Sequence, residues 1–103
     1  MCNKIYREVL DLVVAETEIS ADLILSKSRV AEVVDARQLV VWFCFKRGLY
    51  PRTIANLLCI SRQAVCQKIQ TIADRRRNKA FQYLFDRVQV KCKEPSSNGQ
   101  ITA

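Results

Sequence analysis

The sequence predicts an all-α fold, a bundle of about six helices around one long central helix. Apolar residues recur at three- and four-residue spacing along most of the chain, which is the pattern of helices with one buried face. Alternating apolar and polar runs, the pattern of half-buried strands, are weak. Serine, proline and glycine also stand where helices of ordinary length would begin and end.

The first helix is predicted from about Lys4 to Glu18, because its apolar residues share one face. These residues are Ile5, Val9, Leu12 and Val13. Ser20 is suited to cap a short second helix that ends at Leu25, since its hydroxyl can accept a hydrogen bond from a free backbone N–H group.

The third helix is predicted from about Arg29 to Arg47, with Ser26 or Ser28 as its cap. Gly48 follows it and is the usual residue for a left-handed helix stop. The second half of this helix is apolar on nearly every side. It should therefore lie at the centre of the fold, with the other helices around it.

Three further helix positions follow from local signals. Pro51 suits the first turn of a fourth helix, where a proline loses no intrahelical hydrogen bond. Ser61 is expected to cap a fifth helix, whose inner stripe is Val65, Ile69 and Ile72. A last helix is expected from about Asn78 to Lys91. Its buried residues would be Phe81, Leu84, Phe85 and Val88.

The composition limits the classes of function. At 103 residues there is room for one helical domain, which we expect over residues 1–92, followed by a disordered tail over residues 93–103. The chain has no histidine and only two glycines, so the usual catalytic base and a phosphate loop are missing. Its five cysteines have no CxxC spacing, so a zinc site could form only by long-range assembly. We expect no enzyme activity, cofactor, metal or small-molecule substrate. Cys44 and Cys59 are expected to act as small core residues.

Charge and hydropathy indicate where the protein acts. Seventeen Lys and Arg residues against ten Asp and Glu give a net charge of +7, which favours a polyanionic partner. The amino-terminal segment carries charges through its apolar positions, unlike a signal peptide. The longest apolar run, residues 39–45, is too short to cross a bilayer. We expect a cytoplasmic, nucleoid-associated protein that does not bind membranes.

The stretch Pro51–Gln70 has the apolar spacing of a helix-turn-helix, with Ala55 at the helix crossing and Leu58, Ile60 and Val65 beneath. A purely structural helix pair explains this apolar pattern equally well. It does not explain the outer face of the second helix, which carries glutamine where Glu–Lys pairs are usual. That face would comprise Ser61, Arg62, Gln63, Cys66, Gln67 and Gln70. It suits base edges in a major groove, because glutamine can form two hydrogen bonds with adenine.

Cys59 departs from the usual helix-turn-helix pattern, which has glycine in the turn. A non-glycine residue in the left-handed conformation costs about 1 kcal/mol or more. Either Cys59 adopts that conformation with some strain or the turn takes another shape, and the sequence leaves both open.

Basic residues gather at both ends of this helix pair. Arg75, Arg76, Arg77 and Lys79 follow the fifth helix, and Lys46, Arg47 and Arg52 flank the entry to the fourth. They can contact phosphates, or the first group can complement the carboxyl end of the helix before it. We favour phosphate contact, because clustering around one element is unusual for a uniformly solvated surface.

The segment Leu23–Gln38, LILSKSRVAEVVDARQ, is similar to part of the C-terminal DNA-binding domain of the bacterial replication initiator DnaA, in the Trp-repressor-like helix-turn-helix superfamily. In that family a short helix leads into a Ser-Lys-x-Arg segment, and an Ala- or Pro-Arg-Gln triplet follows on a long central helix. The matching residues are Ser26, Lys27, Arg29, Arg37 and Gln38. The likeness covers about residues 5–72 and implies six helices around a long one.

The resemblance also implies DNA contacts. Arg29 would enter the minor groove beside the helix-turn-helix and read groove width and A·T content. Its alternative role is that of a surface residue without a ligand in the first turn of the third helix. Lys27 and Arg37 would lie near phosphates, and the alternative for Arg37 is a salt bridge to Asp35 or Glu32.

The recognition region departs from the family. The family's Gly-Gly-Arg-Asp-His-Thr-Thr-Val stretch corresponds here to Leu58–Val65, LCISRQAV. The Asp, His and Thr residues that read bases in the family are therefore replaced. We do not expect the initiator's own binding sequence to be recognised.

The leading prediction is sequence-specific binding of double-stranded DNA by a small transcription or replication regulator. The alternative is a protein-interaction module that keeps the fold and docks a partner helix on the glutamine face. RNA binding lacks an exposed aromatic platform, because Trp42, Phe43, Phe81 and Phe85 are expected in the core. The family binds its sites as single domains, which favours a monomer, although the sequence leaves the oligomeric state open.

Overall fold

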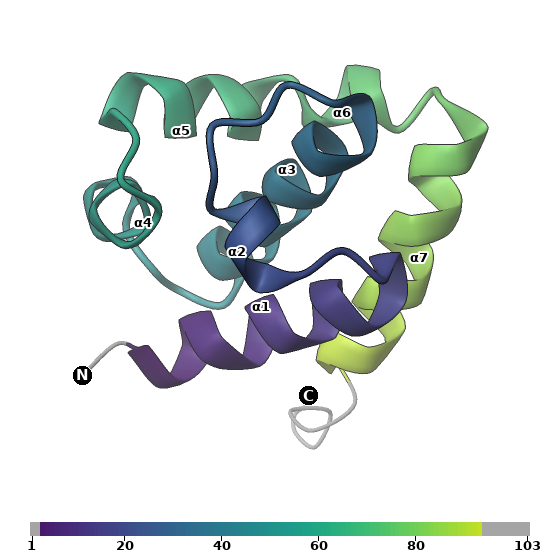
Figure 1. The fold of residues 1–103 in the computed structure, drawn as a ribbon, viewed down its shortest axis with the longest axis horizontal. Coiled ribbons are helices and arrows are strands. Elements are labelled where there is room, and N and C mark those ends of the chain that lie inside the picture. The colour runs from purple at the N-terminus through teal and green to yellow at the C-terminus, as the bar shows by residue number, and fades with distance from the viewer. Residues whose placement is uncertain (1–2, 94–103) are drawn as a thin grey trace.

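The computed structural model describes residues 3–93, which form seven helices and no strand (Figure 1). The helices are α1 (Asn3–Thr17), α2 (Ala21–Ile24), α3 (Ala31–Lys46), α4 (Pro51–Leu58), α5 (Arg62–Gln70), α6 (Ile72–Arg75) and α7 (Lys79–Lys93). The predicted all-α class is confirmed. Helix α7 extends one residue past the expected domain end at 92, and the remainder of the predicted tail lies outside the described residues.

Helix α3 passes through the middle of the molecule and packs against α1, α2, α4, α5 and α7 (Figure 1). Leu39, Val40, Val41 and Cys44 are fully buried, although they point to different sides of this helix. A helix that is apolar all round needs neighbours all round, and α3 has them. In Figure 1, α5 runs along the side of α3 opposite to α1.

Four predicted helix signals are confirmed. The hydroxyls of Ser20 and Ser61 each accept a hydrogen bond from the backbone N–H three residues ahead, at 3.2 and 3.0 Å. Pro51 occupies the first turn of α4. Gly48 follows α3 with φ of 108°, a value that glycine adopts without steric cost.

The predicted start of α3 is wrong by two residues. The helix begins at Ala31, and its cap position is Val30, which makes no side-chain cap. Ser26 donates from its hydroxyl to a carbonyl of α2 at 2.6 Å and accepts from the N–H of Ser28 at 3.1 Å. The hydroxyl of Ser28 in turn accepts from the N–H of Val30 at 3.3 Å. Both serines therefore stabilise the loop 25–30, and neither caps the helix.

The predicted fifth helix is divided at Thr71, which accounts for the additional short helix α6. Gln38, a buried polar residue on α3 that is 4% exposed, donates from Nε2 to the Lys68 carbonyl at 3.0 Å and to the Thr71 hydroxyl at 3.2 Å. The same hydroxyl donates to the Gln67 carbonyl at 2.9 Å. These bonds fasten the carboxyl end of α5 to the central helix.

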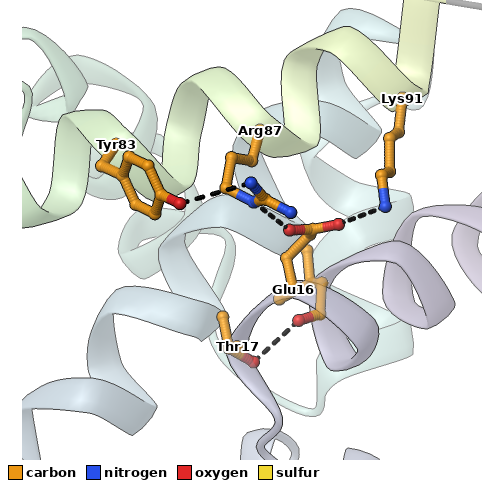
Figure 2. A network of polar contacts seen from close by, with 6 residues as sticks. Glu16, Thr17, Tyr83, Arg87 and Lys91 are labelled. Carbon is orange, nitrogen blue, oxygen red and sulfur yellow. Dashed lines mark hydrogen bonds and ion pairs between the residues drawn. The ribbon is translucent and has the colours of Figure 1, made fainter.

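Helices α1 and α7 are joined by Glu16, whose side chain is only 4% exposed (Figure 2). Arg87 Nε and Lys91 Nζ each donate to one of its carboxylate oxygens at 2.5 Å. Tyr83 accepts a further bond from Arg87 Nη1 at 3.3 Å. The hydrogen bonds from Lys91 and Arg87 lower the pKa of Glu16 below its ordinary value.

Candidate nucleic-acid interface

The turn between α4 and α5 begins at Cys59, which follows the last residue of α4 and adopts the left-handed conformation, with φ 58° and ψ 41°. The N–H of Ile60 bonds to the Ala55 carbonyl at 3.1 Å, and the N–H of Cys59 bonds to the Asn56 carbonyl at 3.4 Å. This is the Schellman arrangement of a helix end. Of the two alternatives for the turn, the strained left-handed one is confirmed, whereas the expectation that Cys59 lies in the core is wrong because its side chain is exposed.

The apolar pattern of this unit is confirmed. Ala55, Leu58 and Val65 are buried, while Ile60 and Ile69 are partly buried against the same core. Any packed helix pair would bury such residues. The buried face therefore explains how α4 and α5 pack. It does not discriminate between functions, so the outer face must be considered.

The outer face of α5 is polar and open. Gln63, Gln67 and Gln70 are exposed, and within residues 3–93 none of their amide groups is hydrogen-bonded to the protein. Together with Ser61 and the half-buried Cys66, they line a shallow depression along the helix. The amides are therefore available to an external ligand that offers both donors and acceptors.

A second depression continues this surface onto α4. Its lining includes Arg52, Arg62 and Cys66, and Cys66 also belongs to the first depression. Tyr50 stands at its edge with 77% of its surface exposed. Sequence reasoning missed Tyr50, because only the tryptophan and three of the phenylalanines were considered as aromatic platforms. The sequence signal for Tyr50 is its position directly before Pro51, the proline that starts α4.

The part of the chain that carries the exposed glutamines contains no acidic residue. Residues 36–73, which contain all of α4 and α5, have no Asp or Glu and six Lys or Arg residues. Negative charges that would repel a polyanion are therefore absent from both helices.

Lys27 and Arg29 are exposed in the loop 25–30. Because Arg29 precedes α3, its expected position in the first helical turn is wrong. A groove contact and a surface residue without a ligand both stay predictions for its role. Its side chain projects from a loop whose serine hydroxyls hold the backbone in place, which is compatible with insertion into a groove.

Arg37 supports this loop from within. Its Nε donates to the Ile24 carbonyl at 2.9 Å, and its Nη2 donates to the carbonyls of Ser26 and Ser28 at 2.6 and 3.3 Å. The alternative of a salt bridge to Asp35 or Glu32 is wrong within the described residues. The expected phosphate contact also needs correction, since the guanidinium is turned towards the loop backbone.

Arg37 also relates the loop to α5. Burial lowers the pKa of Lys68 on α5, and the positive charge of Arg37 lowers it further. Arg37 binds the loop carbonyls, and the adjacent Gln38 binds the carboxyl end of α5. The loop 25–30 and that end of α5 therefore meet α3 at consecutive residues.

The arginines after α5 do not form one uniform cluster. Arg75 forms an ion pair with Asp35 on α3, and its guanidinium carbon lies 5.4 Å from the centre of the Phe81 ring. This side chain therefore fixes α6 to the core of the bundle.

Arg76 and Arg77 differ from each other as well. Arg76 Nε donates to Gln82 at 2.8 Å, and its guanidinium carbon lies 4.3 Å from the centre of the Phe85 ring. Arg77 is exposed and has no hydrogen bond or ion pair from its side chain within residues 3–93. Within residues 3–93, Arg77 is thus the one of the three whose whole guanidinium has no partner in the protein.

Within residues 3–93, no group of three or more cysteine, aspartate or glutamate side chains is placed to hold a metal ion. None of the helices in that range combines the length and the apolarity needed to cross a bilayer. The chain matches no protein-family model, no curated protein and no solved structure.

Proposed function

We propose that the protein binds double-stranded DNA through a helix-turn-helix, with α5 in the major groove and Arg29 in the adjacent minor groove. The observation that carries this proposal is the row of free amides formed by Gln63, Gln67 and Gln70. They stand on a helix whose end is fixed to α3 by Gln38. A reading helix needs such fixation, because hydrogen bonds to bases depend on position.

The chemistry of the amides favours bases over phosphates. A glutamine offers a donor and an acceptor side by side and so matches the N6 and N7 atoms of adenine, a pair worth about 1–3 kcal/mol of discrimination. A phosphate accepts hydrogen bonds only and is served better by arginine and lysine. Arg52 and Arg62, exposed at the edge of the same surface, supply those contacts in the proposal.

The position of the loop 25–30 supports the second contact. The loop that carries Arg29 and the carboxyl end of α5 meet α3 at consecutive residues. The resemblance of Arg29 to the minor-groove arginine of the initiator family suggests the same use here. The guanidinium is weakly hydrated and enters a narrow groove at a smaller desolvation cost than lysine. Such a protein would serve as a small regulator of transcription or replication.

Selection of bound duplexes from a random DNA pool tests the proposal. We expect enrichment of a sequence that contains adenines in a major-groove half-site beside an A·T run. The affinity for the selected duplex should fall linearly in log salt with a slope of several units, because each phosphate contact releases counterions. Failure to enrich any sequence at low salt would reject DNA reading. A partner protein that binds the glutamine face with little salt dependence would favour the protein-interaction module instead.

A further inference from the structure

A cavity of about 350 Å³ opens between the carboxyl-terminal half of α3 and α7. Its walls include three aromatic residues and three basic residues, which are Trp42, Phe43, Phe85, Lys46, Arg47 and Arg76. None of its lining residues belongs to the two depressions on α4 and α5. It is therefore a site separate from the proposed DNA surface.

The aromatic walls are arranged around the cavity at an angle to one another. The ring of Phe85 lies 5.1 Å from that of Phe43 and 6.3 Å from that of Trp42, with interplanar angles of 43° and 41°. Phe43 and Phe85 are only 4% and 1% exposed, whereas Trp42 is half-buried. Trp42 is therefore the ring that a planar aromatic ligand can contact, in the offset or edge-to-face geometry that aromatic groups prefer.

The basic residues bring positive charge to these rings. Lys46 Nζ lies 5.5 Å from the ring centre of Trp42, and the guanidinium carbon of Arg76 lies 4.3 Å from that of Phe85. Arg47 is neutralised by Glu8 at 3.0 Å. Within residues 3–93, neither Lys46 nor Arg76 has a carboxylate partner, and no Asp or Glu lines the cavity.

We propose that this cavity binds a small planar aromatic anion, of the aryl carboxylate class. The aromatic body would lie against Trp42. The carboxylate would be received by Lys46 and by the Nη groups of Arg76, since only Nε of that guanidinium is bonded to Gln82. The volume lies at the small end of the range of ligand pockets, about 300–1,000 Å³, which suits a ligand of one or two fused rings. A free phosphate would leave the aromatic walls without contacts, and a partner helix is too large for the space.

Trp42 provides a direct reporter, because it is the only tryptophan in the chain. Its single indole N–H resonance in an ¹H–¹⁵N spectrum can be followed during titration with 1-naphthoate, the neutral isostere 1-naphthamide and the non-aromatic anion cyclohexanecarboxylate. We expect a saturable shift with 1-naphthoate and about tenfold weaker binding of each of the other two compounds, since each lacks one half of the recognition. Isothermal titration calorimetry should give the same order.

Charge-removing variants locate the site. Lys46→Gln and Arg76→Gln, both at exposed side chains, should each weaken 1-naphthoate binding by about tenfold. Lys79→Gln removes the same charge from an exposed residue outside the cavity and should leave the affinity unchanged. No saturable binding of 1-naphthoate, equal binding of the amide, or an equal loss in Lys79→Gln would overturn the inference. None of these results depends on DNA binding.

Discussion

Glutamine is the side chain that separates base reading from simple charge attraction on this surface. We predict that Gln63→Ala and Gln67→Ala each weaken binding to the selected duplex by about fivefold or more and leave binding to random duplexes nearly unchanged. The reason is that their amides would contact bases and not phosphates. Fluorescence anisotropy with both duplexes measures the two affinities. Gln89→Ala on α7 is the matched control, and equal losses on both duplexes in the α5 variants would count against base reading.

Arg29 makes the second prediction at the level of single residues. Arg29→Ala should lower the affinity most for sites with an A·T run beside the major-groove half, where the minor groove is narrow. Arg29→Lys should restore only part of the loss. The measurement compares paired duplexes with A·T and G·C flanks. Arg7→Ala, which removes another exposed arginine from α1, is the control. An equal loss on both flanks, or none, would reject insertion into the minor groove.

Arg37 and Gln38 show how far residue types alone can predict a site. The Ala-Arg-Gln triplet of the resemblance indicated that these two residues matter, and the structure gives both of them defined hydrogen-bond partners. It places them inside the protein, however, where Arg37 binds the loop backbone and Gln38 binds the end of α5. The sequence could not show this, because their partners lie 9 to 33 residues away along the chain.

Between elements, the contact of Glu16 with α7 predicts a pH-dependent stability. The pKa of Glu16 is lowered in the folded protein, so its contribution is present above the ordinary glutamate pKa of 4.5 and is lost as the pH falls through the folded-state pKa. Glu16→Gln should therefore lower the free energy of unfolding at neutral pH, and the difference should shrink in acid.

Urea unfolding of both proteins over this pH range measures the effect. Glu18→Gln is the control, since Glu18 is exposed and forms no ion pair within the described residues. A difference between Glu16→Gln and the unchanged protein that stays constant down to acid pH would show that the ion pairs with Arg87 and Lys91 do not stabilise the fold.

The arginine that ends α6 and the two that follow it in the turn before α7 are predicted to have different roles. Arg77→Ala should reduce the slope of log affinity against log salt by about one unit, as expected for one lost phosphate contact. Arg75→Ala should leave the slope unchanged and lower the thermal stability, because it removes the ion pair with Asp35. Replacing Arg75, Arg76 and Arg77 together should also reduce the slope by only about one unit. A loss of about three units would show that the internal partners are released when DNA binds.

At this scale the sequence predicted helix ends where the signal is local, and it was wrong where a distant contact decides. Ser61 and Gly48 act within one turn of their own helix and were identified. Thr71 lies between α5 and α6 and accepts a hydrogen bond from Gln38 on α3. No residue near Thr71 in the sequence indicates that α5 ends there. Cys59 adopts a left-handed conformation similar in kind to that of Gly48, which residue type alone argued against.

Across the whole molecule, α3 lies between α5 and α1. Helix α5 is on one side of α3, and α1 is on the other (Figure 1). The cavity between α3 and α7 is a third region with its own aromatic and basic lining. The proposed ligand site thus has no lining residue in common with the two depressions of the proposed DNA surface.

Mapping of backbone amide chemical shifts on addition of the selected duplex tests the DNA-binding proposal most directly, because it reports every face of the molecule at once. We predict that the perturbed amides fall on α5, the start of α4, the loop 25–30 and the turn that carries Arg77, and that those of α1 and the exposed side of α7 stay unchanged. Perturbations centred on α1 or α7, or no perturbation at low salt, would contradict the proposal.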